Sequence, residues 1–154
     1  MNQLEGYRDR GARALVLLHE RELRSCLAAW RRAVAWGVSL PLGTGHYASE
    51  QALLRHVLGA AAGYLRWIAD KLELGDAGVE VVPEPETIEE RADAYLEHVL
   101  ERWREVLRDA PGERFGETYR ANWGEELSIE SMLEHAVVHP MRHALQLEEL
   151  MTPS

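Results

Sequence analysis

The stretch that decides the fold is the last long segment of the chain, SIESMLEHAVVHPMRHALQLEELM at residues 128–151. On a helical wheel with about 100° per residue, its apolar side chains gather on one face, which is typical of a helix packed against a core. These apolar side chains are Ile129, Leu133, Ala136, Val137, Pro140, Ala144, Leu147 and Met151. Ser128 occupies a candidate N-cap position, and Pro153 follows the end. The segment therefore predicts an amphipathic helix that ends near Met151.

Two segments near the start of the chain show the same helical spacing of apolar residues. The first covers residues 7–36 and is expected to stop at Gly37. The second begins at Ser49, another candidate N-cap, and is expected to end at Gly75. No stretch of the chain alternates apolar and polar residues as a strand would, so we expect no strands.

A third segment opens with Thr87-Ile88-Glu89-Glu90 and stops at Pro111-Gly112. The opening residues predict a capping box, in which the Thr hydroxyl and the Glu carboxylate accept hydrogen bonds from free backbone N–H groups. The connections at residues 75–86 and 113–127 are longer than a tight helical hairpin needs. The sequence therefore predicts an all-α fold, a four-helix bundle with long crossover connections, in one domain spanning residues 1–154.

The composition excludes several classes of function. The chain has 17 basic and 26 acidic residues and a net charge of −9, so we expect no nucleic-acid partner. Its single cysteine, Cys26, excludes an internal disulfide and a CxxC site, and we expect it in the core. No apolar run approaches the roughly 20 residues of a membrane span, and residues 1–13 are too polar for a signal peptide. We therefore expect a cytoplasmic protein that does not contact membranes.

Histidine is the residue type that points to chemistry. Three of the seven histidines, His135, His139 and His143, follow one another at intervals of four in the last helical segment. Imidazoles at positions i and i+4 lie on one helix face and can bind the same metal ion. The wheel places His143 inside the apolar face, His139 at its edge and His135 outside, in solvent. His139 and His143 are therefore the candidate pair, either as metal ligands or as hydrogen-bonded residues at the edge of the core.

A metal site needs a third ligand from another helix. His56 is the best candidate, because it shares one edge of the second helical segment with Ala60, Gly63 and Trp67. The small residues leave room beside the imidazole, and Trp67 can form a wall of the space.

The other histidines are weaker candidates. His98 lies among charged residues on the polar side of the third segment, so we expect it in solvent. His19 lies on a crowded apolar helix and is expected to be structural. His46 lies in a glycine-rich loop, where it can reach a pocket, although nothing in the sequence requires it there.

With His56 in the second helix and the run His139-xxx-His143-xx-Gln146 in the last, the chain resembles the DinB/YfiT-like superfamily of metal-dependent enzymes. The resemblance covers nearly the whole chain. It implies an up-down-down-up four-helix bundle, often a homodimer, in which His56, His139 and His143 bind a divalent metal ion. The chain departs from the family pattern at Pro140 and at Ala144-Leu145, where members often carry an acidic residue and Arg-Gly.

Three neutral imidazoles leave the charge of a zinc or nickel ion uncompensated and leave coordination positions open. Such an ion lowers the pKa of a bound thiol. The resemblance points the same way, because relatives include bacillithiol transferases and mycothiol-dependent maleylpyruvate isomerases. We therefore expect transfer of a low-molecular-weight thiol to a small electrophile, in a pocket lined by Trp67 and Trp123, with Gln146 hydrogen-bonding beside the metal.

Two alternatives stay open. The first is a metal-dependent hydrolase that uses a bound hydroxide, with Glu134 or Glu50 as candidate general acid. The second is a non-catalytic bundle that binds a ligand or a partner, with structural histidines.

A further expectation concerns Pro140, which lacks the N–H that would bond the carbonyl of Ala136, so the last helix is expected to carry a local defect there.

Overall fold

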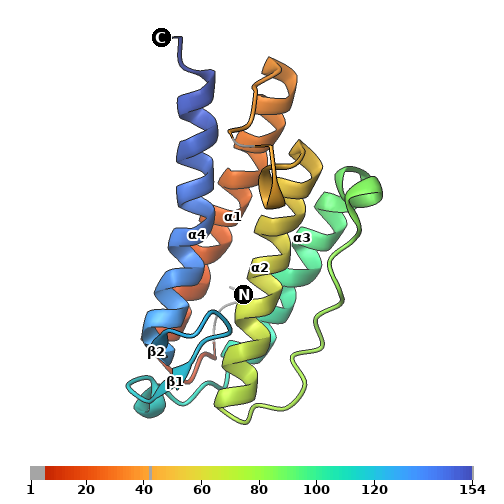
Figure 1. Cartoon of the computed structure of the whole chain (residues 1–154). Coiled ribbons are helices and arrows are strands. Elements are labelled where there is room, and N and C mark those ends of the chain that lie inside the picture. The colour runs from red at the N-terminus through yellow and green to blue at the C-terminus, as the bar shows by residue number, and fades with distance from the viewer. Residues whose placement is uncertain (1–5, 42, 154) are drawn as a thin grey trace.

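The computed structural model describes residues 6–41 and 43–153. Its four long helices are α1 (Arg10–Trp36), α2 (Glu50–Lys71), α3 (Pro85–Leu107) and α4 (Ile129–Met151). In Figure 1, α1 runs upward, α2 and α3 run downward, and α4 runs upward again. The predicted up-down-down-up four-helix bundle is confirmed.

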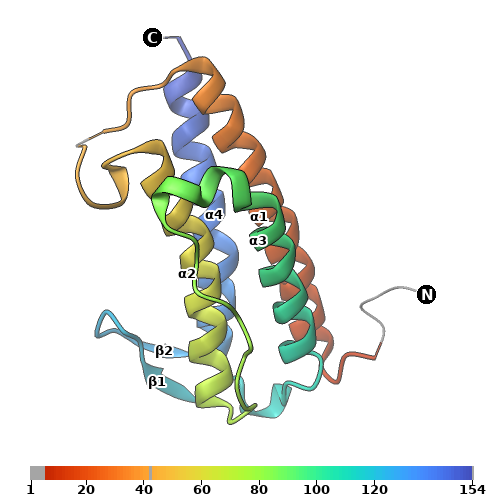
Figure 2. The ribbon, with the colours of Figure 1, turned by 90° about the vertical axis from the view of Figure 1, so that its right-hand side faces the viewer.

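The helices enclose one hydrophobic core. Helix α1 packs against α4 and α3, while α2 packs against α3 and α4. Because α2 and α3 run in the same direction, the chain between them must return along the bundle, and Figure 2 shows this crossover rising beside α2 to the start of α3. Cys26 is 3% exposed within this core, as predicted, and burial raises the pKa of its thiol to about 12.

Several helix ends lie where the sequence predicts them. The Ser49 hydroxyl accepts a hydrogen bond from the backbone N–H of Ala52 at 2.9 Å. The Ser128 hydroxyl caps α4 in the same way, accepting from the N–H of Ser131 at 3.0 Å. Helix α1 ends at Trp36, and its C-cap is the expected Gly37, whose φ of 79° lies in the left-handed region that favours glycine.

Two predicted helix starts are wrong. Helix α3 begins at Pro85, ahead of the expected capping box at Thr87, and its N-cap residue Glu84 makes no side-chain capping bond. Proline suits this first helical position because its φ is already fixed near the helical value and its missing N–H would have no intrahelical partner. Helix α1 begins at Arg10 rather than residue 7, because the Asp9 side chain caps it by accepting from the N–H of Ala12.

The connection between α3 and α4 contains a small β-hairpin, so the expectation of a chain without strands is wrong. After the short 3₁₀ helix η2 (Gly112–Arg114), strand β1 (Thr118–Arg120) pairs antiparallel with β2 (Glu126–Ser128). Each strand has three residues, too few to show an alternating pattern. The indole of Trp67 on α2 donates to the carbonyl of Arg120 at 3.0 Å and so holds the hairpin to the bundle.

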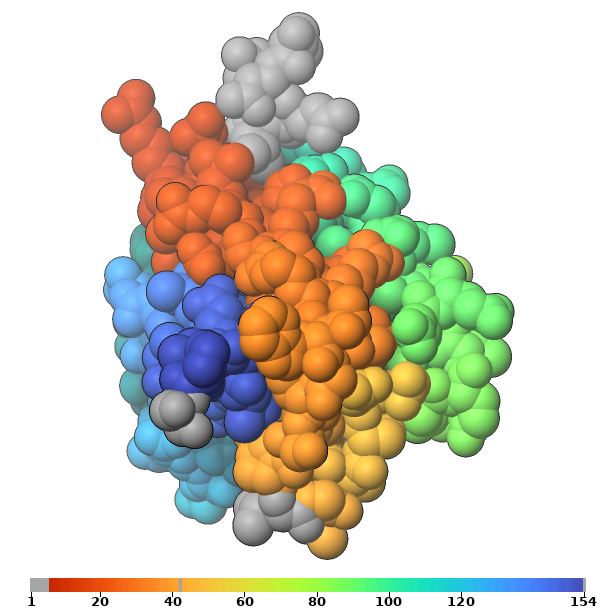
Figure 3. Space-filling model, turned by 90° about the horizontal axis from the view of Figure 1, so that it is seen from above, coloured from red at the N-terminus to blue at the C-terminus, as the bar shows by residue number. Residues whose placement is uncertain are grey.

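At the opposite end of the bundle lie residues 37–41 and 43–49, which include the 3₁₀ helix η1 (Gly45–Tyr47). Val38 and Leu40 of this segment pack against the core. In Figure 3, which views the molecule from above, the orange end of α1 and the residues after it lie beside the dark blue end of α4. This segment therefore brings η1 close to the upper half of α2 and α4.

Helix α4 continues through Pro140 as one helix from Ile129 to Met151. Pro140 supplies no N–H to the carbonyl of Ala136, so the expected defect is confined to that missing hydrogen bond within an unbroken helix.

No helix in the part of the chain that the structure describes is long and apolar enough to cross a membrane.

Candidate metal centre

Helix α4 turns two of its three histidines inward. His139 is 6% exposed and His143 is 5% exposed. His135 is half-buried rather than solvated, which corrects the sequence-based expectation. Its Nε2 lies 3.2 Å from the hydroxyl of Tyr64, and its ring centroid lies 5.2 Å from that of Trp123. The helical wheel of α4 misses this because the cover comes from outside the helix, from Tyr64 on α2 and from Trp123 in the hairpin that folds back over α4.

His56 meets this face of α4 from α2. Its Nε2 lies 3.1 Å from the Nε2 of His139. Two imidazole nitrogens that bind one ion at about 2.0–2.1 Å are separated by about 3–3.4 Å. The two side chains therefore have the spacing of two ligands of a single ion.

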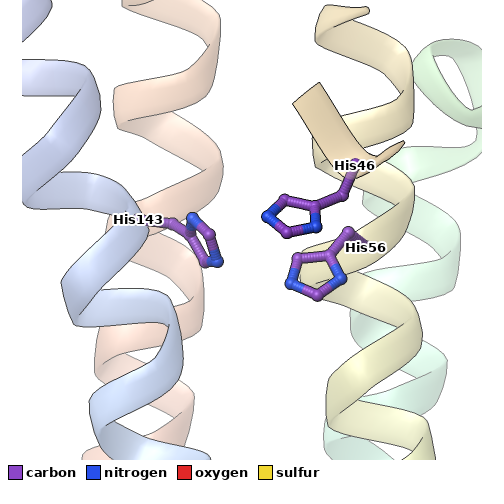
Figure 4. A group of neighbouring side chains, drawn as sticks. All are labelled: His46, His56 and His143. Atoms are coloured by element: carbon purple, nitrogen blue, oxygen red, sulfur yellow. The ribbon is translucent and has the colours of Figure 1, made fainter. Parts of the chain in front are cut away.

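A fourth histidine, His46, comes from η1, and the sequence predicts it only as a loop residue that can reach a pocket. Its ring stacks on that of His56, with centroids 4.0 Å apart and an angle of 14° between the planes. His46, His56 and His143 each offer a ligand atom within 4.8 Å of the other two. In Figure 4, His143 points from α4 across the gap toward His46 and His56.

The predicted ligand set and this observed group share two residues. His56 and His143 belong to both, whereas His139 was predicted from the α4 spacing and His46 is brought in by the loop. One feature of the sequence that points to His46 as a site residue is its position just before the Ser49 cap. The chain that leads into α2 there passes close to the second turn of the helix, which carries His56.

Gln146 orients His143 rather than facing the histidine cluster directly. The Oε1 of Gln146 lies 2.9 Å from Nδ1 of His143 and also accepts a 2.9 Å hydrogen bond from the hydroxyl of Tyr47. Because a carboxamide oxygen only accepts hydrogen bonds, Nδ1 of His143 carries the proton and donates it. Nε2 is then the nitrogen whose lone pair is available to a metal ion.

The electrostatics of the cluster keep the imidazoles neutral. Burial, together with the neighbouring histidines, lowers the pKa of His139 to about 3 and that of His56 to about 4. Burial also lowers the pKa of His143. At neutral pH each of these three rings is therefore a neutral imidazole, in which one ring nitrogen carries a proton and the other has a lone pair that can bind metal.

A pocket of about 450 Å³ opens beside His56. Its aromatic wall consists of Tyr64, Trp67 and Trp123. Trp67 is 7% exposed, whereas Trp123 is 50% exposed and lies at the rim. The pocket therefore reaches from His56, at the edge of the histidine cluster, to an aromatic wall whose rim lies at the hairpin.

The two remaining histidines lie elsewhere and outside the metal-capable group. His98 accepts a hydrogen bond from the N–H of Glu80 at 2.9 Å and is half-buried, not solvated as expected. His19 is 1% exposed, and its ring packs on Trp103 with centroids 4.2 Å apart, in keeping with a structural residue.

The fold and the site together define a helical bundle with a histidine centre between α2 and α4. A model of the DinB superfamily matches residues 44–147, a range that includes His46, His56, His139 and His143. The chain belongs to the DinB superfamily. No curated protein and no solved structure matches it.

Proposed function

We propose that this protein is a metal-dependent enzyme that transfers a low-molecular-weight thiol to a small organic electrophile, with zinc or nickel as the ion. The observation that carries the proposal is that histidines from α2, α4 and η1 bring their ring nitrogens close together. The residues fit a divalent ion by their chemistry, because each offers an imidazole nitrogen and the group contains histidines alone.

In this proposal His56, His139 and His143 hold the ion, and His46 is a further nitrogen within reach of His56 and His143. Gln146 and Tyr47 fix the tautomer and the direction of the His143 ring. When bound, such an ion supplies one effect, a lowered pKa for a thiol that approaches it. The buried rings of His139 and His143 reduce the access of water from the α4 side and so strengthen that electrostatic effect.

The pocket favours thiol transfer over the alternative of hydrolysis. Besides Arg55, His56 and Asn122, its described lining has aromatic and apolar side chains, and it contains no carboxylate. A hydrolase would place a general acid beside the leaving group, whereas a thiolate that adds to an electrophile needs a dry cavity of suitable shape. The aromatic wall suits a small organic electrophile.

The test is an assay of metal-loaded protein against a panel of electrophiles, run with bacillithiol, mycothiol, glutathione or no thiol. We expect turnover with a thiol, loss of turnover when the thiol is withheld, and loss of turnover in His143→Ala. The matched control is His135→Ala, on the same helix, which should retain metal. If the protein turns over a substrate without any thiol, and His143→Ala abolishes that turnover, the result would contradict the transferase and favour a hydrolase. Absence of both turnover and bound metal would favour a non-catalytic bundle.

A further inference from the structure

Two glycines one turn apart on α2, Gly59 and Gly63, have different surroundings. A Cβ atom at Gly59 would lie 3.1 Å from Cγ1 of Val82, so the crossover packs closely against the backbone there. A Cβ at Gly63 would meet nothing within 4 Å. Close packing therefore explains why position 59 lacks a side chain, and it does not explain why position 63 lacks one.

The open side of Gly63 belongs to the pocket beside His56. From Arg55 to Trp67 the pocket follows α2 for about 18 Å, at a rise of about 1.5 Å per residue. His56 lies near one end, and the aromatic wall lies at the other. The absent side chain of Gly63 thus keeps a passage open between the histidine cluster and the aromatic rings.

The charge of the pocket comes from one residue. Among the described residues of the lining, Arg55 is the only Lys, Arg, Asp or Glu. Its Nε donates to the carbonyl of Pro83 at 3.1 Å, which fixes the guanidinium at the end of the pocket near His56. Its one carboxylate contact, with the exposed Glu84, is long at 3.5 Å. Such an exposed pair is weak, so the guanidinium remains a good partner for the carboxylate of a ligand.

The net charge of −9 does not argue against an anionic ligand at this position. Charges on the rest of the surface are screened over about 8 Å at physiological salt, whereas a carboxylate beside Arg55 would be in direct contact with the guanidinium.

We infer that the pocket binds a flat aromatic carboxylate, with its acidic group at Arg55 and its ring passing over Gly63 toward Trp67 and Trp123. This ligand class rests on the proposed function, since it describes the electrophilic substrate of the same site. Gly63 then sets the size of substrate that is accepted, and Arg55 sets the preference for an anion.

The experiment measures binding of 2-naphthoate and of its neutral analogue 2-naphthamide to the metal-free full-length chain, by tryptophan fluorescence and calorimetry. In the wild type we expect naphthoate to bind about tenfold or more tightly than naphthamide, the ratio typical of a hydrogen bond to a charged group. Arg55→Gln should remove this preference and leave naphthamide binding unchanged.

Size is tested with Gly63→Val, which should abolish measurable binding of both ligands. Gly63→Ala is a milder change that a helix tolerates well, and it should weaken the binding of both ligands. It keeps the test valid if the valine variant does not fold. Gly116→Ala is the control, because Gly116 also has open space around a Cβ and lies outside the pocket lining.

Equal affinity for the two ligands in the wild type, a preference that survives Arg55→Gln, or unchanged binding in both Gly63 variants would overturn the inference. The measurement uses neither metal nor thiol. Specific naphthoate binding without thiol transfer would therefore leave the pocket assignment standing and contradict the proposed function alone.

Discussion

The Nε2 atoms of His56 and His139 lie 3.1 Å apart, although one residue belongs to α2 and the other to α4. These helices run in opposite directions in the bundle (Figure 1) and pack directly on each other. The distance between the two nitrogens is therefore set by the packing of the bundle core, not by a flexible loop. A site built in this way is positioned before any ligand arrives, which reduces the cost of binding.

Gln146→Leu should weaken metal binding by about 10- to 100-fold, the usual cost of removing the hydrogen-bond partner of a metal-binding histidine. The reason is that His143 loses the acceptor that fixes its tautomer. Gln146→Glu keeps an oxygen at this position and should retain most of the affinity. Competition with a chromogenic chelator measures both variants, and equal affinity for wild type and Gln146→Leu would show that Gln146 has no orienting role.

Gly63→Ala should raise the free energy of unfolding by about 0.5–1 kcal/mol, because alanine replaces glycine inside a helix and meets no neighbour. Gly59→Ala is the matched control in the same helix. Its added methyl would press on Val82, so the helix-propensity gain should be reduced or reversed. Urea unfolding of the two variants gives the comparison. A larger gain for Gly59→Ala than for Gly63→Ala would contradict the assigned difference in space.

His19 should make the protein less stable in acid. It is fully buried, its two ring nitrogens have no hydrogen-bond partner among the described residues, and burial lowers its pKa from 6.5 to about 3. Between these two values the unfolded chain binds a proton at His19 that the folded chain does not. Stability therefore falls as the pH drops from about 6.5 toward 3, by at most about 1.4 kcal/mol per pH unit for this one proton.

His19→Leu removes that proton site and two buried polar atoms without partners. The free energy of unfolding, measured by urea titration between pH 4.5 and 7.5, should depend less steeply on pH than in the wild type. At pH 7 the variant should be at least as stable, because no partner is left unsatisfied. An unchanged pH dependence would mean that His19 is protonated in the folded state.

Periodicity and capping residues predict most of the bundle. The Leu- and Ala-rich stripes, the caps at Ser49 and Ser128, and the stop at Gly37 are local features, and each helix end that depends on them lies where expected. Helix α3 starts at Pro85, ahead of the predicted Thr87 capping box, and proline at the first helical position is itself a local signal. The hairpin was missed because its strands are short and are held by contacts remote in sequence, such as Trp67 with Arg120.

The residues of the candidate site also fall into those that local sequence predicts and those that only the folded chain brings together. The inward direction of His139 and His143 follows from their helical phase, which the sequence contains. The arrival of His46 beside His56 depends on how the residues between α1 and α2 fold back, and no periodic pattern records that. The contact of His135 with Trp123 likewise depends on where the hairpin lies, and its contact with Tyr64 depends on how α2 packs against α4.

The most direct test of the account is the metal content of the untagged protein, measured by mass spectrometry for the wild type and single alanine variants. We expect about one divalent ion per chain in the wild type and in His135→Ala, and none in His56→Ala or His143→Ala. His46→Ala should bind more weakly than the wild type and more tightly than His56→Ala, because His46 comes from a short 3₁₀ segment rather than a long helix. A metal-free wild type, or a site emptied by His135→Ala and still filled in His56→Ala, would contradict the account.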